Sequence, residues 1–259
     1  MVLGWWRKRH NAAFTIDDAR WAELCANAPL VAGLDDERRE RLRALSAEFL
    51  TQKTLSPVHD LVLGIPERIA LAAHACLPLL AFGREGWRGW SEIIVYPGAF
   101  RVEEGRHGAP HDMEELEVVD TGFEDREGES WQYGPMVLSW EDLVAEIRTP
   151  EPGFQLVIHE MAHKLDALDG VMDGTPPLPR DWQRAWARDF GAAFNALCAQ
   201  LEDDADAETA IDSYAADCPE EFFAVVSEYH FTAPDVLRGA MPAVAEHLER
   251  FYGPPPKLS

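Results

Sequence analysis

The chain has 259 residues, of which 46 are acidic and 23 are basic, so its formal net charge is −23. This length allows a sizeable hydrophobic core in one large or two small domains, and no apolar run reaches the roughly 18 residues of a membrane-spanning helix. The excess of acidic residues argues against direct binding of nucleic acid, which needs lysine and arginine to neutralise phosphates.

The N-terminal segment and the cysteines indicate the compartment. Residues 1–10 contain aromatic and basic side chains, but they lack the apolar segment and cleavage site of a signal peptide. The four cysteines are scattered and form no CxxC pair, so we expect reduced thiols at Cys25, Cys76, Cys198 and Cys218. The sequence therefore predicts a cytoplasmic protein with no membrane partner, and we expect a monomer.

Helical periodicity dominates the first third of the chain. Leu42, Leu45 and Phe49 recur at helical spacing, and Asp35 can cap the start of their helix. Pro66 stands where a first helical position favours proline, directly before an apolar segment. The helices expected here cover residues 16–26, 35–52 and 66–77.

The middle third changes to short segments of β-branched or alternating residues separated by Gly, Pro and Asp. Such segments are typical of strands, so we expect a small sheet. The expected strands cover residues 92–97, 100–104, 116–119 and 135–139. The stretch from Ser139 to Asp142 then resembles a capping box that leads into a short helix.

The last third is predicted to be almost wholly helical, with helices over residues 154–168, 180–201, 219–231 and 241–251. Gly170 and the proline-rich stretch 176–179 separate the first two of these helices. Residues 202–208 form an acidic stretch without the glycine of a calcium loop, which indicates a solvated turn. Helices, a small sheet and more helices, in that order, predict an α+β fold.

One motif carries most of the chemical information. His159, Glu160 and His163 form an HExxH sequence, and on a helix the two histidines lie on one side, one turn apart. Both imidazoles can then bind one Zn²⁺, and Glu160 can act as general base towards a water molecule that the metal activates. A structural zinc site is disfavoured because no cysteine lies near His159.

A catalytic zinc needs a third protein ligand, and three candidates compete for this role: Asp169, His230 and Glu221. Asp169 stands ten residues after His159, where the metzincin pattern places its last ligand, but the glycine of that pattern is missing. Glu221 belongs to a separate downstream helix and borders an apolar face, as the third ligand of a gluzincin does. Periodicity alone favours Glu221 only slightly over Glu220 or Glu228.

Several stretches together resemble the Mlc titration factor A family of zinc peptidases. The resemblance covers about residues 19–252 and is more specific than HExxH alone. The matching stretches are residues 49–53, 94–97, 130–140, 158–166, 211–214 and 219–229.

The resemblance implies one Zn²⁺ per chain, bound by His159, His163 and Glu221, with Glu160 as the catalytic base. It also places a tyrosine at Tyr214, whose phenol could donate a hydrogen bond to the oxyanion of a tetrahedral intermediate. A packed residue at the entry of a helix is the alternative for Tyr214.

Asp166 lies one turn beyond His163. It could orient an imidazole N–H, or it could be a solvated helix residue. His107 and His111 stand in a stretch with Gly and Pro, so we interpret them as loop residues and not as a second metal site.

The resemblance also implies the architecture: a mainly helical, zincin-like metallopeptidase core related to the protease domain of anthrax lethal factor, with a small β-sheet and added N-terminal helices. We expect a single domain over residues 11–252 and flexible ends at 1–10 and 253–259. Its expected parts are an N-terminal helical part at about 16–83, a small sheet at about 90–140 and a helical catalytic part at about 153–252.

The function that follows is a zinc-dependent metallopeptidase of aminopeptidase character with a peptide as substrate. The alternative is a regulatory protein that binds and sequesters a transcriptional repressor, because the enterobacterial member of the family binds the glucose repressor Mlc. The acidic stretches 103–117 and 202–208 depart from that member, and loops are where partner surfaces differ. An acidic rim would favour substrates with a cationic N-terminus.

Overall fold

The computed structural model describes residues 13–98, 134–204 and 207–258 of the chain. Its first elements are α1 (Asp18–Asn27), α2 (Pro29–Ala32), α3 (Asp36–Gln52), β1 (Thr54–Pro57), α4 (Ile65–Cys76), the 3-10 helix η1 (Gly83–Trp87), β2 (Glu92–Tyr96), β3 (Met136–Ser139) and α6 (Trp140–Arg148). The later elements are α7 (Leu156–Asp166), η2 (Ala167–Asp169), α8 (Arg180–Asp203), η3 (Ser213–Ala216), α9 (Pro219–Thr232), α10 (Pro234–Ala240) and α11 (Pro242–Tyr252).

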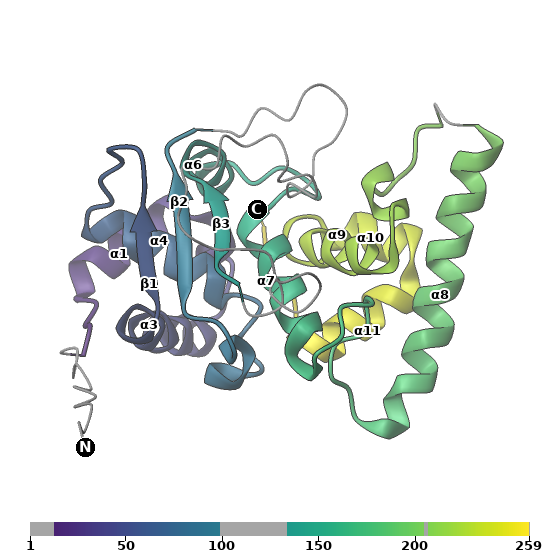
Figure 1. Ribbon diagram of the computed structural model, residues 1–259, viewed down its shortest axis with the longest axis horizontal. Coiled ribbons are helices and arrows are strands. Elements are labelled where there is room, and N and C mark those ends of the chain that lie inside the picture. Colours follow the sequence, from purple (N-terminus) through teal and green to yellow (C-terminus); the bar gives the residue numbers. More distant parts are fainter. Residues whose placement is uncertain (1–12, 99–133, 205–206, 259) are drawn as a thin grey trace, which may run out of the picture.

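The described elements form two groups with α7 between them (Figure 1). The sheet lies in one group with α1, α3, α4 and α6, and the other group consists of α8 to α11. Helix α7 contacts β3, α4 and α6 on one side and α9 on the other. The expected α+β architecture, mainly helical with a small sheet, is therefore confirmed, and α7 occupies its centre.

The sheet has three parallel strands in the order β1-β2-β3. Ile93 of the central strand pairs with Leu55 of β1 and with Met136 of β3. Along β2, Ile93 and Val95 are buried, whereas their neighbours are half-buried, as expected of a strand with one face in the core. The last strand of the sheet thus leads directly into α6 and towards α7.

Sequence patterns predicted the longer described elements but missed several short ones, which are α2, β1, η1, η3 and α10. Strand β1 has four residues, ends on Pro57 and follows α3 directly, so it offers almost no alternating pattern. Helix α10 has seven residues and lies between two prolines that begin α10 and α11. The strands expected at 100–104 and 116–119 lie outside the described residues.

Where the sequence offers a side chain that can cap a helix, the helix begins at the predicted residue. Asp35 accepts the backbone N–H of Arg38 at 2.8 Å, and Ser139 accepts that of Asp142 at 3.4 Å. Leu42, Leu45 and Phe49 are buried, as their helical spacing predicts. Local sequence therefore determined these elements correctly.

An aromatic cluster joins α8, α9 and α11. The rings of Trp186 and Phe190 stack with their centroids 3.9 Å apart, and Trp186 also lies 5.7 Å from both Phe223 and Phe251. Large aromatic side chains contribute much buried apolar area and specific ring geometry. This cluster holds α9, which faces α7, firmly against α8 and α11.

Residues 253–258, for which the sequence predicts a flexible end, lie against the N-terminal helices. The backbone N–H of Lys257 donates to the carbonyl of Gly33 at 2.9 Å, and Pro256 is buried. Arg38 of α3 donates to the carbonyl of Pro254. The last described residues therefore pack against α2 and α3.

Two further expectations concern the chemistry of the chain. No helix among the described residues has both the length and the apolar character needed to cross a membrane. All four cysteines are free thiols, as their scattered positions predict.

Candidate metal centre

Helix α7 carries His159 and His163 on one side, one turn apart. The start of this helix is held by buried polar groups. Glu146 of α6 accepts the first backbone N–H of the helix, that of Leu156, at 2.7 Å, and the side chain of Gln155 accepts the next two, those of Val157 and Ile158. These contacts satisfy donors that a helix end leaves free, so they fix where α7 begins and where its histidines lie.

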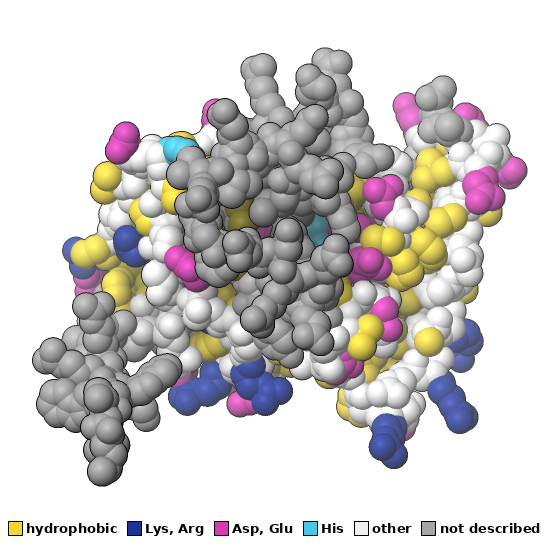
Figure 2. All heavy atoms as spheres, in the orientation of Figure 1, with side chains coloured by type: hydrophobic (Ala, Val, Ile, Leu, Met, Phe, Trp, Pro, Cys, Tyr) yellow, Lys and Arg dark blue, Asp and Glu magenta, His cyan; other side chains and the backbone are white. Residues whose placement is uncertain are grey.

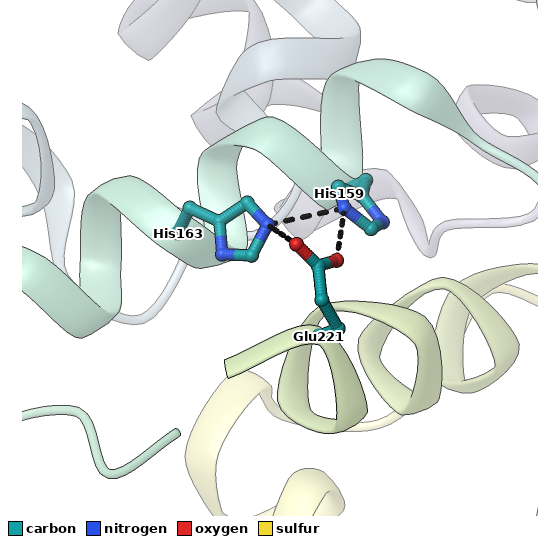
Figure 3. A group of neighbouring side chains, drawn as sticks. All are labelled: His159, His163 and Glu221. Atoms are coloured by element: carbon teal, nitrogen blue, oxygen red, sulfur yellow. Dashed lines mark hydrogen bonds and ion pairs between the residues drawn. The ribbon is translucent and has the colours of Figure 1, made fainter. Parts of the chain in front are cut away.

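Helix α9 carries Glu221 in its first turn, two residues after the proline that begins the helix. An acidic residue is favourable there because the helix N-terminus has a partial positive charge. Glu221 is only 5% exposed, and Phe222 and Phe223 beside it are buried in the aromatic cluster. In Figure 3 its carboxylate points from α9 towards both histidines of α7.

The three side chains converge on one point (Figure 3). Nε2 of His159 lies 3.0 Å from Oε2 of Glu221, and Nε2 of His163 lies 3.5 Å from Oε1. The two Nε2 atoms are 3.1 Å apart. Four ligands at tetrahedral positions around zinc, about 2.1 Å from the ion, are separated by about 3.4 Å. The observed separations are close to this value, with each histidine facing a different oxygen of Glu221.

A neighbouring carboxylate shows that this donor set fits a cation. Nδ1 of His159 lies 2.8 Å from Oε1 of Glu228, and because a carboxylate only accepts, Nδ1 carries the proton. A neutral imidazole would then direct the lone pair of Nε2 at the carboxylate of Glu221, so a positive charge is needed between them, either a second proton on His159 or a bound cation. Two histidines and one glutamate are also a known ligand set of catalytic zinc.

The electrostatics of the cluster favour positive charge. Burial alone would lower the pKa of His159, but hydrogen bonds to Glu221 and Glu228 raise this pKa well above its usual value. Burial would raise the pKa of Glu221, yet the two histidines lower it strongly. The imidazoles and carboxylates thus stabilise each other's charged forms, as they would stabilise a bound cation.

The two predicted catalytic residues lie beside this group. Glu160 follows His159 on α7 and is partly exposed, and its charge raises the pKa of Lys164, which burial lowers. The ring of Tyr214 in η3 stacks on the imidazole of His159 with centroids 6.2 Å apart. Burial and a hydrogen bond between its hydroxyl and Glu221 raise the pKa of Tyr214.

The rival candidates for the third ligand do not join the group. Asp169 is exposed after the end of α7. His230 is buried on α9, and its Nε2 lies 3.1 Å from the carbonyl oxygen of Gly253. Glu220 is partly exposed and does not belong to the group. Among the described residues, His159, His163 and Glu221 form the only such group of three potential metal ligands.

Asp166 has neither of the surroundings that the sequence suggested. It is fully buried, and its Oδ2 accepts the backbone N–H of Gly174 at 2.7 Å. It therefore binds the loop that follows α7 and is not a solvated helix residue. His107 and His111 lie outside the described residues.

The sequence did not predict the role of Glu228, which it offers only as a rival ligand to Glu221. It lies two turns after Glu221 on α9, and seven residues on a helix place both on one side. Its Oε1 contacts His159, and its Oε2 accepts the N–H of Gln155. The spacing of seven residues between two buried glutamates was the available signal.

Comparison with known proteins yields relatives along nearly the whole chain. Residues 3–253 match the family described as "Glucose-regulated metallo-peptidase M90". A protein named Mlc titration factor A from Serratia proteamaculans (strain 568) is 35% identical over 253 residues, which cover 97% of this chain and 92% of that protein. A protein of the same name from Yersinia pestis (strain Pestoides F) is 35% identical over 235 residues, covering 90% of this chain and 84% of its own length.

Proposed function

The chain belongs to the family of glucose-regulated metallo-peptidases M90, as its motifs predict, and on that premise we propose that it is a zinc-dependent peptidase. The observation that carries this proposal is the convergence of His159, His163 and Glu221, with one donor atom of each within 4.8 Å of the others. A family of metallopeptidases requires a metal ion, and these residues form a suitable donor set.

The proposed roles follow from the positions of the side chains. When bound, zinc supplies a Lewis acid that polarises a peptide carbonyl and acidifies water. His159, His163 and Glu221 hold the ion through two imidazole nitrogens and a carboxylate. Glu160, which is partly open to solvent beside His159, takes the proton of the attacking water and passes it to the leaving amine.

Tyr214 is proposed to donate a hydrogen bond to the carbonyl oxygen of the substrate as negative charge develops there. Its ring lies against His159 and its hydroxyl lies beside Glu221, so the phenol is directed at the proposed metal position. Because burial and Glu221 raise the pKa of Tyr214, the hydroxyl keeps its proton at neutral pH and remains a donor.

Aminopeptidase character is the finer part of the proposal. It is supported by the family resemblance and by the net charge of −23, which favours substrates with a cationic N-terminus. Figure 2 shows Asp and Glu side chains scattered over the part of this face formed by α8 to α10, whereas Lys and Arg lie mainly along its lower margin.

The test compares Glu160→Gln with His159→Ala in the full chain. We expect Glu160→Gln to bind one zinc ion and to lose hydrolysis of amino-acid arylamides, because the amide keeps the shape of the side chain but cannot accept the proton. His159→Ala should lose both zinc and activity. Full activity of Glu160→Gln, or zinc binding by His159→Ala equal to that of the unchanged protein, would refute the proposed roles.

The printed name of the relatives favours a second candidate function. Proteins called Mlc titration factor A are named for an effect on Mlc, so we propose as the alternative that this chain binds and sequesters an Mlc-like transcriptional repressor, with peptidase activity secondary. Capture of a purified repressor by zinc-free His159→Ala separates the two. Sequestration should survive the loss of zinc, and a repressor that fails to bind either protein rules it out.

We further propose that the protein acts as a cytoplasmic monomer with a single domain over residues 11–252. Four free thiols are in keeping with a reducing compartment. A net charge of −23 makes copies of the chain repel one another.

A further inference from the structure

Asp166 is a fully buried carboxyl at the C-terminal end of α7, one turn beyond His163. One of its oxygens, Oδ2, accepts the backbone N–H of Gly174 at 2.7 Å. The other oxygen, Oδ1, has no hydrogen-bond partner among the described residues. A buried carboxyl with so few partners destabilises the fold unless the segment that it holds compensates.

Gly174 is a loop residue that contacts three helices. Its φ of +78° lies in the left-handed region, and a Cβ here would lie 2.3 Å from the carbonyl oxygen of Pro219, the first residue of α9. Its own carbonyl accepts the indole N–H of Trp186, on α8, at 3.2 Å. Asp166 of α7, Trp186 of α8 and Pro219 of α9 therefore all contact Gly174.

The first turn of α9 needs such a contact because no side chain caps it. Cys218 occupies the capping position without forming a capping hydrogen bond. Glu221 follows two residues after Pro219, so a displacement of this turn would move the carboxylate of Glu221. Metal ligands must be held to within about 0.5 Å, and Nε2 of His159 lies only 3.0 Å from Oε2 of Glu221.

We propose that Asp166 is a positioning residue for the metal centre, which it controls by holding Gly174 against Pro219. The loop then acts as a spacer that sets the separation of α7 and α9, and with it the distance from Glu221 to the two histidines. Among the described residues, no hydrogen bond links Asp166 to the three ligands. The inference rests on the metal site proposed above.

The test measures the zinc dissociation constants of purified, metal-free proteins by competition with a chromogenic chelator. Asp166→Ala removes the acceptor, and Gly174→Ala forces the loop away from Pro219. Gly170→Ala is a matched control, since Gly170 also has a positive φ of +94° but a Cβ there meets nothing within 4 Å. Asp169→Ala removes an exposed carboxyl of the same segment.

We expect Asp166→Ala and Gly174→Ala to bind zinc about 10- to 100-fold more weakly, as residues that orient metal ligands do, and both controls to stay within about threefold of the unchanged protein. Asp166→Asn keeps an oxygen that can accept from Gly174 and should restore most of the affinity. Saturating zinc should restore kcat in the weakened variants with KM unchanged, which a general loss of stability would not do. Affinities of Asp166→Ala and Gly174→Ala equal to those of their controls would overturn the inference.

Amide hydrogen exchange of the metal-free proteins tests the spacer without zinc. Exchange at residues 222–225 should rise in Asp166→Ala and Gly174→Ala but not in the controls. If the unchanged protein binds no zinc but amide exchange still rises in Asp166→Ala and Gly174→Ala, the proposed metal site is wrong and the proposed spacer is correct. If zinc binds normally and exchange is unchanged, the spacer is wrong. If both variants fail to fold, Trp186→Phe is used instead, because it removes the donor to Gly174 and keeps an aromatic ring. It must show the same loss of zinc affinity and the same rise in amide exchange.

Discussion

At the scale of single residues, the buried polar side chains near the site are hydrogen-bonded to one another and to the helix that carries the histidines. Glu228 accepts a hydrogen bond from Nδ1 of His159 and another from the backbone N–H of Gln155 at the start of α7. One carboxylate therefore fixes both the orientation of an imidazole and the start of the helix that carries it. Groups that orient a metal-binding histidine in this way determine its affinity for the metal as well as its geometry.

Replacing Glu228 should weaken zinc binding without removing a ligand. We expect Glu228→Ala to lower zinc affinity about 10- to 100-fold, because His159 loses the acceptor that directs its Nε2 towards the site. Glu228→Gln, which keeps an oxygen acceptor but no charge, should show a smaller loss. Chelator competition measures both, and Glu220→Ala in the same helix serves as a control that leaves the affinity unchanged. Unaltered zinc binding by Glu228→Ala would contradict this role.

At the scale of elements, the metal centre depends on where two helices begin. Buried acidic side chains hold the start of α7, and the loop after α7 lies against the start of α9. Glu146 accepts the backbone N–H of Leu156. Burial raises the pKa of the Glu146 carboxyl to about 7, and it outweighs this hydrogen bond, which acts to lower the pKa. We therefore expect the stability of the start of α7 to depend on pH.

The sign of this effect follows from proton linkage. Between pH 4.5 and about 7 the unfolded chain releases the Glu146 proton while the folded protein retains it, so stability falls as pH rises through this window. Glu146→Gln keeps an acceptor for Leu156 and cannot titrate. The free energy of unfolding of the unchanged protein should fall relative to that of Glu146→Gln by up to about 3 kcal/mol across the window. Urea unfolding at several pH values measures it, with exposed Glu141→Gln as control, and parallel pH profiles for all three proteins would refute it.

At the scale of the whole molecule, the C-terminal residues lie against the N-terminal helices. Residues 253–258 follow α11 and lie against α2 and α3, where Lys257 donates its N–H to Gly33. A Cβ at Gly33 would lie 2.6 Å from the carbonyl oxygen of Lys257, although the φ of −71° at Gly33 suits alanine. This contact connects the group of helices around the sheet with the group that contains α9.

Removing this connection should destabilise the protein. We expect deletion of residues 253–259 to lower Tm by about 5 °C, because the hydrogen bond to Gly33 and the burial of Pro256 are lost. Gly33→Ala should give a similar shift by displacing the same residues, whereas Lys257→Ala keeps the backbone bond and should have little effect. Thermal unfolding of the metal-free protein measures these shifts. If Gly33→Ala still destabilises the shortened chain, its effect has another cause.

The sequence by itself determined the local chemistry of this protein. HExxH requires only helical spacing to place His159, Glu160 and His163 together, and the longer helices follow from periodicity and from caps such as Asp35. The pairing of Glu221 with these histidines came from a family resemblance, because the sequence alone left Glu220, Glu228, Asp169 and His230 as rivals.

Only the tertiary structure decided contacts between residues far apart in the chain. It brought Glu221, and none of its rivals, together with the two histidines, placed Glu228 beside the imidazole of His159, and buried Asp166 against Gly174. Periodicity reports which side of a helix faces the core but not which partner it meets there, since that depends on how helices pack. For this reason the two candidate histidine ligands could be predicted from local sequence, whereas the residues that hold the candidate site in place could not.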